Sequence, residues 1–292
     1  MFYHGAGDKN TNLIVGMTQF DQLYKESILK IMNEGFEEYN ERTGHKTKII
    51  PGLTFELDLG FPLLTLMKIP IQLFLAEQIW YIMGSKNPED FVNKFTSIWK
   101  DFTEKDGTVA AAYGHRWRKA FGRDQLGLLI KHLQEQPGSR HGVVITWDPR
   151  EDGLGNPESK KNVPCPYTFT VNIIGNRLHI NSIVRSNDMV LGCPHDVAGF
   201  YLLLCILAAK LGIKPGKLTH SISNAHIYDT HYKQAWELTE RANNHPDIYF
   251  EAQPDYFDRA EKGDITLVQE IVDKLSRQYK PLAYIKGLKI VL

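Results

Sequence analysis

The most constraining feature of this sequence is an apolar run, Val197 to Ala209 (VAGFYLLLCILAA), which contains no charged side chain. The run is shorter than the ~20 residues that a helix needs to cross a bilayer. A helix that is apolar on every face is stable in water only when it is buried. We therefore expect a buried helix over Asp196 to Leu211 and a chain that folds around it, with no membrane partner.

Two further segments predict long helices. Ile69 to Met83 (IPIQLFLAEQIWYIM) is almost wholly apolar but places one carboxylate, Glu77, in its middle. Between Gln19 and Thr43, apolar residues recur at helical spacing, which predicts a helix that ends before Arg42. The residues that give this spacing are Ile28, Ile31, Met32 and Phe36.

The strand signals lie mainly in the second half of the chain. Tyr167–Ile174 and Arg177–Val184 alternate in polarity and flank Gly175-Asn176, the composition of a tight hairpin turn. Arg140–Trp147 and Lys217–Ile227 predict two more strands. No linker rich in Pro, Gly or Ser separates helices from strands, so we expect one α+β domain over residues 1–292. Residues 1–15 are expected to be a loose N-terminal segment.

Charge and composition exclude several classes of protein. Lys and Arg total 34 and Asp and Glu also total 34, which removes the general attraction to a phosphate backbone that nucleic-acid binders show. With 42% hydrophobic residues, the chain is neither disordered nor collagen-like. The first ten residues, MFYHGAGDKN, have no apolar stretch or cleavage site of a signal peptide. We expect a cytoplasmic protein, or one of a host's cytoplasm if it is viral, with no nucleic-acid polymer as partner.

The three cysteines, Cys165, Cys193 and Cys205, fit no zinc-binding spacing and are expected to be reduced. Cys205 lies in the apolar run and is predicted to be a core residue. Cys193 lies in a turn between Gly192 and Pro194, where its thiol is expected to be structural. Cys165 is fixed between two prolines, and the residues alone leave it open whether it is a nucleophile or a spacer.

Two other features suggest chemistry. A carboxylate in an apolar helix, such as Glu77, must be hydrogen-bonded, and burial raises its pKa toward values useful for acid–base catalysis. The alternative is a structural carboxylate paired with Lys or Arg. Arg185-Ser186-Asn187-Asp188 ends a predicted strand, and an arginine beside a hydroxyl suits a phosphomonoester and also lowers the pKa of a nearby thiol. Taken alone, this segment fits a surface ion pair better than a site, and its value comes from its combination with Cys165.

Seven short motifs occur together in this chain. In order and spacing they strongly resemble the thymidylate synthase superfamily from about Arg42 to about Tyr228. The resemblance implies that family's α+β fold, with a mixed sheet packed by long helices and a homodimer formed through the sheet. The motifs are Gly60-Phe61-Pro62-Leu63, Glu77 before Ile79-Trp80, Tyr113-Gly114 with Trp117-Arg118, Pro164-Cys165, Arg185-Ser186-x-Asp188, Leu191-Gly192-x-Pro194, and His226-x-Tyr228.

The same resemblance implies a role for each matching residue. Cys165 would add as a thiolate to C6 of a pyrimidine nucleoside monophosphate, which activates C5 toward a one-carbon electrophile. Glu77 would move protons through ordered water. The implied co-substrate is 5,10-methylene-tetrahydrofolate, with no metal. The implied ligands are Arg42, Arg185 and Ser186 for phosphate, with Arg140 lent by the dimer partner; His226 and Tyr228 for the sugar; and Trp99, Asp188 and Gly192 for folate, with Tyr113 on the same wall.

One departure from the family pattern concerns the base. Thymidylate synthases usually have Pro-Phe-Asn after the Leu-Gly turn, and that Asn reads uracil, whereas this chain has Pro194-His195-Asp196. An ionised carboxylate only accepts hydrogen bonds, so it would repel O4 of uracil and suit the 4-amino group of cytosine. Asp196 matches the residue that distinguishes deoxycytidylate hydroxymethylases within the superfamily. The alternative reading of Asp196 is a helix N-cap.

Other departures concern the transferred carbon. Asn162 is polar where the synthases are apolar, and on the folate side of the site it could hold a water. Pro166 replaces the usual His, and Tyr279 to Leu292 lacks the usual closing tail. These features favour conversion of dCMP to 5-hydroxymethyl-dCMP. The alternatives are a cytidylate C5-methyltransferase, a CMP hydroxymethylase, a thymidylate synthase acting on dUMP, and a non-enzymatic nucleotide- or RNA-binding relative, which the retained Cys165 and Glu77 disfavour.

Overall fold

A mixed β-sheet forms one layer of the computed structural model, which describes residues 16–154 and 163–291. Within these residues seven strands form one sheet in the order β1-β2-β7-β5-β4-β3, with β6 paired to β7. β5 and β6 run parallel to β7, and the other pairs are antiparallel. The expected α+β domain with a mixed sheet is therefore confirmed. The strands are β1 (Phe36–Asn40), β2 (His45–Leu57), β3 (Val143–Ile145), β4 (Pro166–Ile174), β5 (Arg177–Val184), β6 (Asn187–Asp188) and β7 (Lys214–Tyr228).

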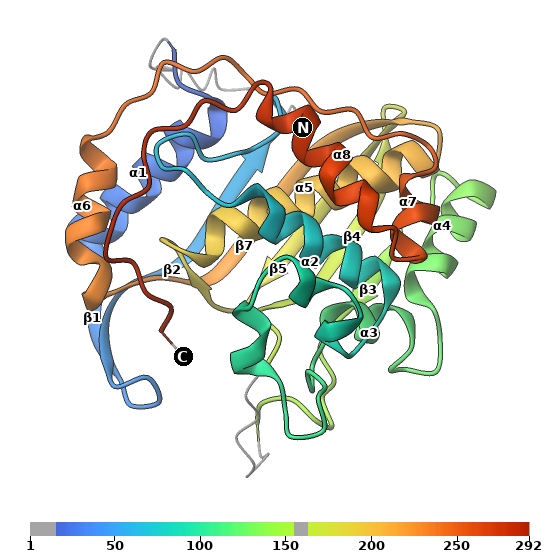
Figure 1. The fold of residues 1–292 in the computed structure, drawn as a ribbon, viewed down its shortest axis with the longest axis horizontal. Helices are drawn as coiled ribbons and strands as arrows, with labels where there is room; N and C mark the ends of the chain where they lie inside the picture. Colours follow the sequence, from blue (N-terminus) through green and yellow to red (C-terminus); the bar gives the residue numbers. More distant parts are fainter. Residues whose placement is uncertain (1–15, 155–162, 292) are drawn as a thin grey trace, which may run out of the picture.

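Helices are layered on one face of this sheet, as Figure 1 shows. α5 packs on β5 and β7, and α2 packs on the opposite side of α5, against α7 and α8. α1 covers β2 and contacts α6. The helices are α1 (Gln19–Glu34), α2 (Ile71–Met83), α3 (Tyr113–Arg118), α4 (Gln125–Glu135), α5 (Gly192–Lys210), α6 (Tyr232–Glu240), α7 (Tyr256–Glu261) and α8 (Ile265–Ser276), with 3₁₀ turns η1 (Pro88–Asp90), η2 (Val92–Lys94), η3 (Ile98–Phe102) and η4 (Asp229–His231).

The apolar run forms the buried helix that the sequence predicts. α5 is long and apolar enough to cross a membrane by length and composition alone, but 78% of its most apolar window is buried inside the protein. The buried side chains belong to the main hydrophobic core, which joins α5 to α2 and to the inner face of the sheet. α5 is thus the central core helix between the sheet and α2.

The first helix is shorter than predicted. α1 ends at Glu34, where the N–H of Gly35 bonds to the carbonyl of Ile31, and the chain then enters β1. The prediction of a helix up to Arg42 was wrong because it counted Phe36 as a core residue. In the structure Phe36 is 67% exposed on an edge strand.

The start of α5 also differs from the prediction. The helix begins at Gly192 and not at Asp196, because Oδ1 of Asp188 accepts hydrogen bonds from the N–H groups of Val190 and Leu191 and closes the turn before it. Asp196 therefore lies inside the helix. Its alternative reading as the N-cap was wrong.

The predicted hairpin is confirmed. β4 and β5 pair from Pro166↔Val184 to Ile174↔Arg177, and both turn residues, Gly175 and Asn176, have φ of 58°. This left-handed geometry is that of the turn that matches the twist of paired strands. β3 is shorter than the predicted Arg140–Trp147, and β7 is slightly longer than predicted.

A buried carboxylate fixes the segment that leads into α2. Asp21, in the first turn of α1, accepts hydrogen bonds from the N–H and the hydroxyl of Thr65 at 2.7 and 2.6 Å. Thr65 in turn holds the C-terminal part of the chain, because its carbonyl accepts from the N–H of Leu282 at 2.9 Å. These bonds help to place α2, and with it Glu77.

The opposite face of the sheet is only partly covered. Inner-face side chains such as Val144 and Phe169 are fully buried, whereas Val143 and Ile145 on the other face are 47% and 46% exposed. Strand pairing continues this second face across β4, β5 and β7. We call it the outer sheet face; it comprises Val143, Ile145, Thr168, Thr170, Asn181, Ile183, Thr219 and Ser221.

Candidate active site

Cys165 lies just before β4, held by backbone contacts on both sides. Its N–H donates to the hydroxyl of Tyr113 at 3.1 Å, and its carbonyl accepts from the N–H of Arg185 at 2.9 Å. The Arg185 guanidinium donates to the carbonyls of Pro164 and Val163 and lies 3.8 Å from the Cys165 sulfur. The thiol is thus fixed beside a permanent positive charge.

The groups around this thiol shift its pKa in opposite directions. Burial raises the pKa of Cys165, while the positive charges of Arg185 and Arg42 lower it and the negative charge of Asp196 raises it. The net direction is upward, so the isolated chain keeps the thiol protonated near neutral pH.

Two carboxylates share the interior of the site. Glu77, on α2, accepts a hydrogen bond from the indole N–H of Trp99 at 2.8 Å. Burial raises the pKa of Glu77 to about 8, with a further upward contribution from Asp196, against the Trp99 hydrogen bond. Burial also raises the pKa of Asp196 to about 7. Paired acids poised near neutrality are typical of proton-transfer sites.

Asn187 is a site residue to which sequence reasoning assigned no role. It lies on β6, is 3% exposed, and its side-chain Nδ2 donates to Oδ2 of Asp196 at 2.6 Å. The signal available in the sequence was its place between Ser186 and Asp188, two residues with expected ligand contacts. The hydrogen bond favours the ionised form of Asp196 and acts against the effect of burial on its pKa.

An aromatic wall lines one side of the two carboxylates. The ring centroid of Tyr81 lies 5.2 Å from that of Tyr113 and 6.3 Å from that of Trp99. The ring centroids of Trp99 and Trp80 are 5.0 Å apart. Tyr81 was also missed in the sequence. It follows Glu77 by four residues on one helix, a spacing that places both on one face. These rings are nearly buried and pack against one another beside Glu77, to which Trp99 donates.

The expected sugar-side residues lie where β6 meets β7. His226 and Tyr228 are both 7% exposed, with ring centroids 5.0 Å apart. β6 pairs Asp188 with His226, and burial lowers the pKa of His226 while the Asp188 charge raises it. The structure thus brings His226, Tyr228 and Asp188 together with Asn187.

The remaining predicted residues divide into two groups. Arg42 follows β1 and is exposed, yet its charge reaches Cys165, His226 and Tyr228. Ser186 lies partly buried between Arg185 and Asn187, and Gly192 begins α5. Arg140, in contrast, is exposed before β3 and contributes to none of these electrostatic contacts. Asn162 lies outside the described residues.

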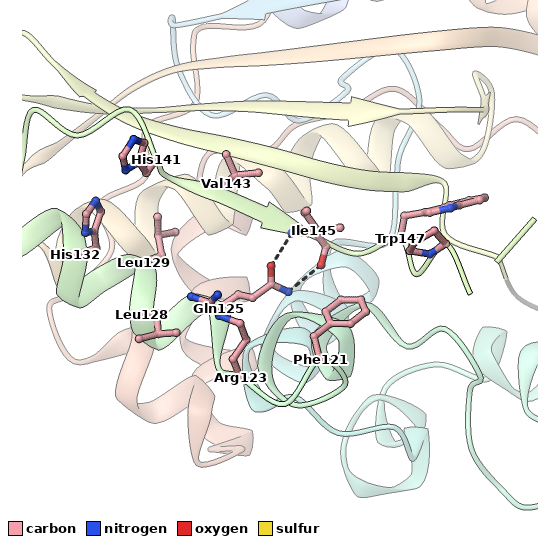
Figure 2. Close-up of a pocket in the computed structure, with 11 residues that line it drawn as sticks. Phe121, Arg123, Gln125, Leu128, Leu129, His132, His141, Val143, Ile145 and Trp147 are labelled. Carbon is pink, nitrogen blue, oxygen red and sulfur yellow. Dashed lines mark hydrogen bonds between the residues drawn. The ribbon is translucent and has the colours of Figure 1, made fainter. Parts of the chain in front are cut away.

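A separate hollow lies at the far edge of the sheet, between α4 and β3 (Figure 2). Its volume is about 630 Å³, and it contains none of the residues predicted for the site. Gln125 ties the two elements together, bonding to the N–H and the carbonyl of Ile145 at 2.8 and 2.9 Å. Its lining includes His141, the residue that follows Arg140, as well as His132, Leu128, Leu129, Val143 and Trp147.

Within residues 16–154 and 163–291, no cluster of three or more His, Cys, Asp or Glu side chains is arranged to hold a metal ion. The described site has a thiol next to an arginine, two carboxylates poised near neutral pH and an aromatic wall. This arrangement is suited to nucleophilic and acid–base chemistry.

A family model described as thymidylate synthase matches residues 22–275. The chain therefore belongs to the thymidylate synthase family, whose enzymes transfer a one-carbon unit from methylene-tetrahydrofolate to C5 of a pyrimidine nucleotide. Enzymes of this family are typically cytoplasmic.

Proposed function

We propose that this protein hydroxymethylates C5 of a cytidine monophosphate, with dCMP as substrate and 5-hydroxymethyl-dCMP as product. The observation that carries the proposal is the Asp196 carboxylate, which lies inside the site with Oδ2 bound to Asn187. No other hydrogen bond to the Asp196 carboxylate occurs among the described residues, so Oδ1 is available to a base.

The base preference follows from hydrogen-bond chemistry. In its ionised form, which the hydrogen bond from Asn187 favours and which predominates above its pKa of about 7, the Asp196 carboxylate accepts hydrogen bonds and donates none. The 4-amino group of cytosine can donate to Oδ1 of Asp196, whereas O4 of uracil only accepts. Sites built on such polar contacts reject a mismatched partner by up to about 10⁴-fold. Asp196 therefore supports a cytosine nucleotide over a uracil nucleotide.

The chain's groups can carry out the proposed steps in order. The Cys165 sulfur forms a bond to C6, which makes C5 nucleophilic. Reduced folate supplies the one-carbon unit at the oxidation level of formaldehyde. After C5 has gained that carbon and lost its proton, water adds to the exocyclic methylene and the C6–S bond breaks. One CH₂ unit and one water give CH₂OH, so no oxidant or reductant is consumed and tetrahydrofolate is released.

Glu77 is the group we assign to the proton transfers. Its pKa of about 8 leaves it mostly protonated at neutral pH, so it can donate a proton through water and take one back. The hydrogen bond from Trp99 fixes one of its oxygens.

The aromatic wall and Asp188 suit a reduced folate. Tyr81, Trp99 and Tyr113 offer ring faces and edges to a flat heterocycle. Asp188 is partly exposed, and its carboxylate can accept from the amino and N–H groups of a pterin. This donor and acceptor set fits the co-substrate.

We also propose that the enzyme is a homodimer joined through the outer sheet face. That face exposes Val143 and Ile145 next to partly buried threonines. Arg140 lies just before β3, away from the thiol of its own chain. A partner packed on this face would place Arg140 to reach the phosphate bound in the other subunit.

The deciding experiment supplies the enzyme with methylene-tetrahydrofolate and dCMP, CMP, dUMP or UMP in H₂¹⁸O and identifies the products by mass. The proposal predicts tetrahydrofolate and 5-hydroxymethyl-dCMP that contains one ¹⁸O atom. Dihydrofolate with 5-methyl-dCMP would show hydride transfer and refute hydration. A preference for CMP would change the sugar assignment, and turnover of dUMP in preference to dCMP would overturn the role of Asp196.

A matched substitution tests the base-reading group itself. Asp196→Asn replaces an acceptor by an amide that can donate to O4 of uracil and accept from N3–H. We expect the ratio of kcat/KM for dCMP to that for dUMP to fall at least about 100-fold. An unchanged ratio in a variant that folds normally would show that another group selects the base.

A further inference from the structure

We propose that Asn187 is a positioning residue for base selection: its amide holds Oδ2 of Asp196 so that Oδ1 alone is presented to the 4-amino group of a cytosine nucleotide. This inference rests on the proposed function, because it concerns how the base-reading carboxylate is oriented. Asn187 would act through Asp196 and would not itself touch the nucleotide.

The fold brings the two side chains together across nine residues of sequence. Asn187 lies on β6, which pairs with Ala225 on β7, and Asp196 lies in the second turn of α5. The Asp188 side chain closes the intervening turn through the N–H groups of Val190 and Leu191. Because both ends of this connection are fixed, the 2.6 Å bond from Asn187 to Asp196 joins a strand to a helix.

A fixed partner matters because a carboxylate has two equivalent oxygens and a broad terminal torsion. Without a partner on one oxygen, the group can rotate and offer either oxygen, or a bound water, to the ligand. With Oδ2 occupied by a charge-assisted hydrogen bond, the direction in which Oδ1 can accept is set before substrate binds. Preorganisation of this kind improves discrimination between bases.

The state of the Asn187 carbonyl argues against a purely structural role. Its Oδ1 is buried and has no hydrogen-bond partner among the described residues, whereas its Nδ2 donates to Asp196. A buried acceptor without a partner opposes folding. The side chain therefore satisfies Asp196 at the expense of its own acceptor, which is the arrangement expected of a group that serves the carboxylate.

Position 192 borders this contact without crowding it. A Cβ at position 192 would lie 3.5 Å from Nδ2 of Asn187 and 3.8 Å from Asp188, in ordinary contact. The amide is thus enclosed by its neighbours without being compressed. A side chain of the same shape without the donor can take its place.

The test uses Asn187→Leu, which keeps the shape and removes both amide functions. Equilibrium binding of dCMP and of dUMP is measured by calorimetry in a Cys165→Ser background, so that turnover does not contribute. We expect the dCMP/dUMP affinity ratio to fall about tenfold, mainly through weaker dCMP binding, with a Tm somewhat below that of the parent, because the Asp196 carboxylate loses its donor. Asn187→Ala, which also removes the donor, should lower the ratio in the same direction and serves if the Leu variant does not fold.

A double-mutant cycle separates positioning from general damage. In an Asp196→Asn background, Asn187→Leu should leave the base ratio unchanged, because the carboxylate on which it acts is absent. Asn243→Leu is the matched control: this amide donates to Thr65 and Lys280 away from the site, so its loss should lower Tm and leave the base ratio unchanged.

Two results would overturn the inference: a parental base ratio in a folded Asn187→Leu protein, or an equal fall of the ratio with and without Asp196. Failure of the proposed function looks different. In that case the parent protein itself would bind dUMP more tightly than dCMP, whatever Asn187→Leu does to the ratio.

Discussion

The thiols of Cys165 and Cys205 lie in different environments. Cys165 is partly buried beside Arg185, whereas Cys205 is 2% exposed in the middle of α5, where burial raises its pKa far above the usual range. Only the first can form a thiolate at a reachable pH and meet a ligand. Position therefore decides which thiol can be the nucleophile.

We accordingly expect opposite effects from the same substitution. Cys165→Ser should lower kcat about 10³-fold or more at unchanged Tm, because a hydroxyl is a much weaker nucleophile. Cys205→Ser should leave kcat near normal and cost about 1–3 kcal/mol of unfolding free energy, because it buries a hydroxyl among apolar side chains. Steady-state rates and urea unfolding of both variants check this. Near-normal turnover of Cys165→Ser would refute the nucleophile.

Glu77 links the site to the pH dependence of stability. Its pKa is about 8 when folded, against 4.5 as its ordinary value, so between these values the folded chain keeps a proton that the unfolded chain has released. The contribution of Glu77 to the free energy of unfolding therefore falls as pH rises from 4.5 to about 8. Glu77→Gln removes this loss while keeping an acceptor for Trp99.

We expect the stability difference between Glu77→Gln and the parent to be small near pH 5 and to favour the variant by on the order of a few kcal/mol near pH 8. Urea unfolding at several pH values measures it, and turnover of the variant should fall strongly at every pH. A difference that does not change between about pH 5 and pH 8 would contradict a raised pKa for Glu77.

The sequence predicted those members of the candidate site that lie in recognisable motifs. Cys165, Glu77, Arg185 and Asp196 lie together as those motifs imply. The contact between Asn187 and Asp196 was not predictable, because it joins a strand to a helix across a turn that the Asp188 side chain closes. Tyr81 could have been predicted, because it follows Glu77 by four residues on the same helix and so lies on the same face.

At the scale of elements, type was easier to predict than boundary. The apolar spacing of α1 was correct up to Met32, but an exposed Phe36 extended the pattern into β1. The start of α5 was hidden because its first turn, Gly192-Cys193-Pro194-His195, does not have the apolar composition of the rest. A turn closed by a side chain, such as that of Asp188, shifts the start of the following helix, and the spacing of apolar residues does not reveal this shift.

The β4–β5 hairpin provides an element-scale prediction. Gly175 has φ of 58°, a left-handed conformation that β-branched residues adopt only with strain. Gly175→Val should lower unfolding free energy by about 1–2 kcal/mol. Gly175→Asn, which tolerates this region, should cost less, and urea unfolding compares the two. Equal stability of the Val and Asn variants would argue against this turn geometry.

At the scale of the whole molecule, the helices bury one face of the sheet and leave the other partly exposed. The inner face carries α5, and above it α2 with Glu77; the outer sheet face carries Val143, Ile145 and polar side chains. With 34 basic and 34 acidic residues, the chain has no general attraction for phosphate. The proposed function therefore assigns the nucleotide phosphate to a few placed arginines, of which Arg140 lies just before β3, apart from the Cys165 surroundings of its own chain.

A mixing experiment tests whether Arg140 acts across a dimer. Arg140→Ala alone should raise KM for the nucleotide about tenfold or more, and Cys165→Ser alone should be inactive. If each site combines Cys165 of one subunit with Arg140 of the other, a mixed dimer contains one site with both groups intact. After subunit exchange of equal amounts, about half of the dimers are mixed, so activity at low nucleotide concentration should recover to about a quarter of the parent.

The size and source of the recovered activity distinguish the arrangements. If Arg140 served its own chain, a mixed dimer would join an inactive site to a weakened one, and mixing would restore nothing beyond the Arg140→Ala activity. A charge on the outer sheet face, Ile145→Asp, provides the control, because it should give monomers in sedimentation analysis and prevent recovery. Recovery without dimers would overturn the shared site, and dimers without recovery would place Arg140 outside it.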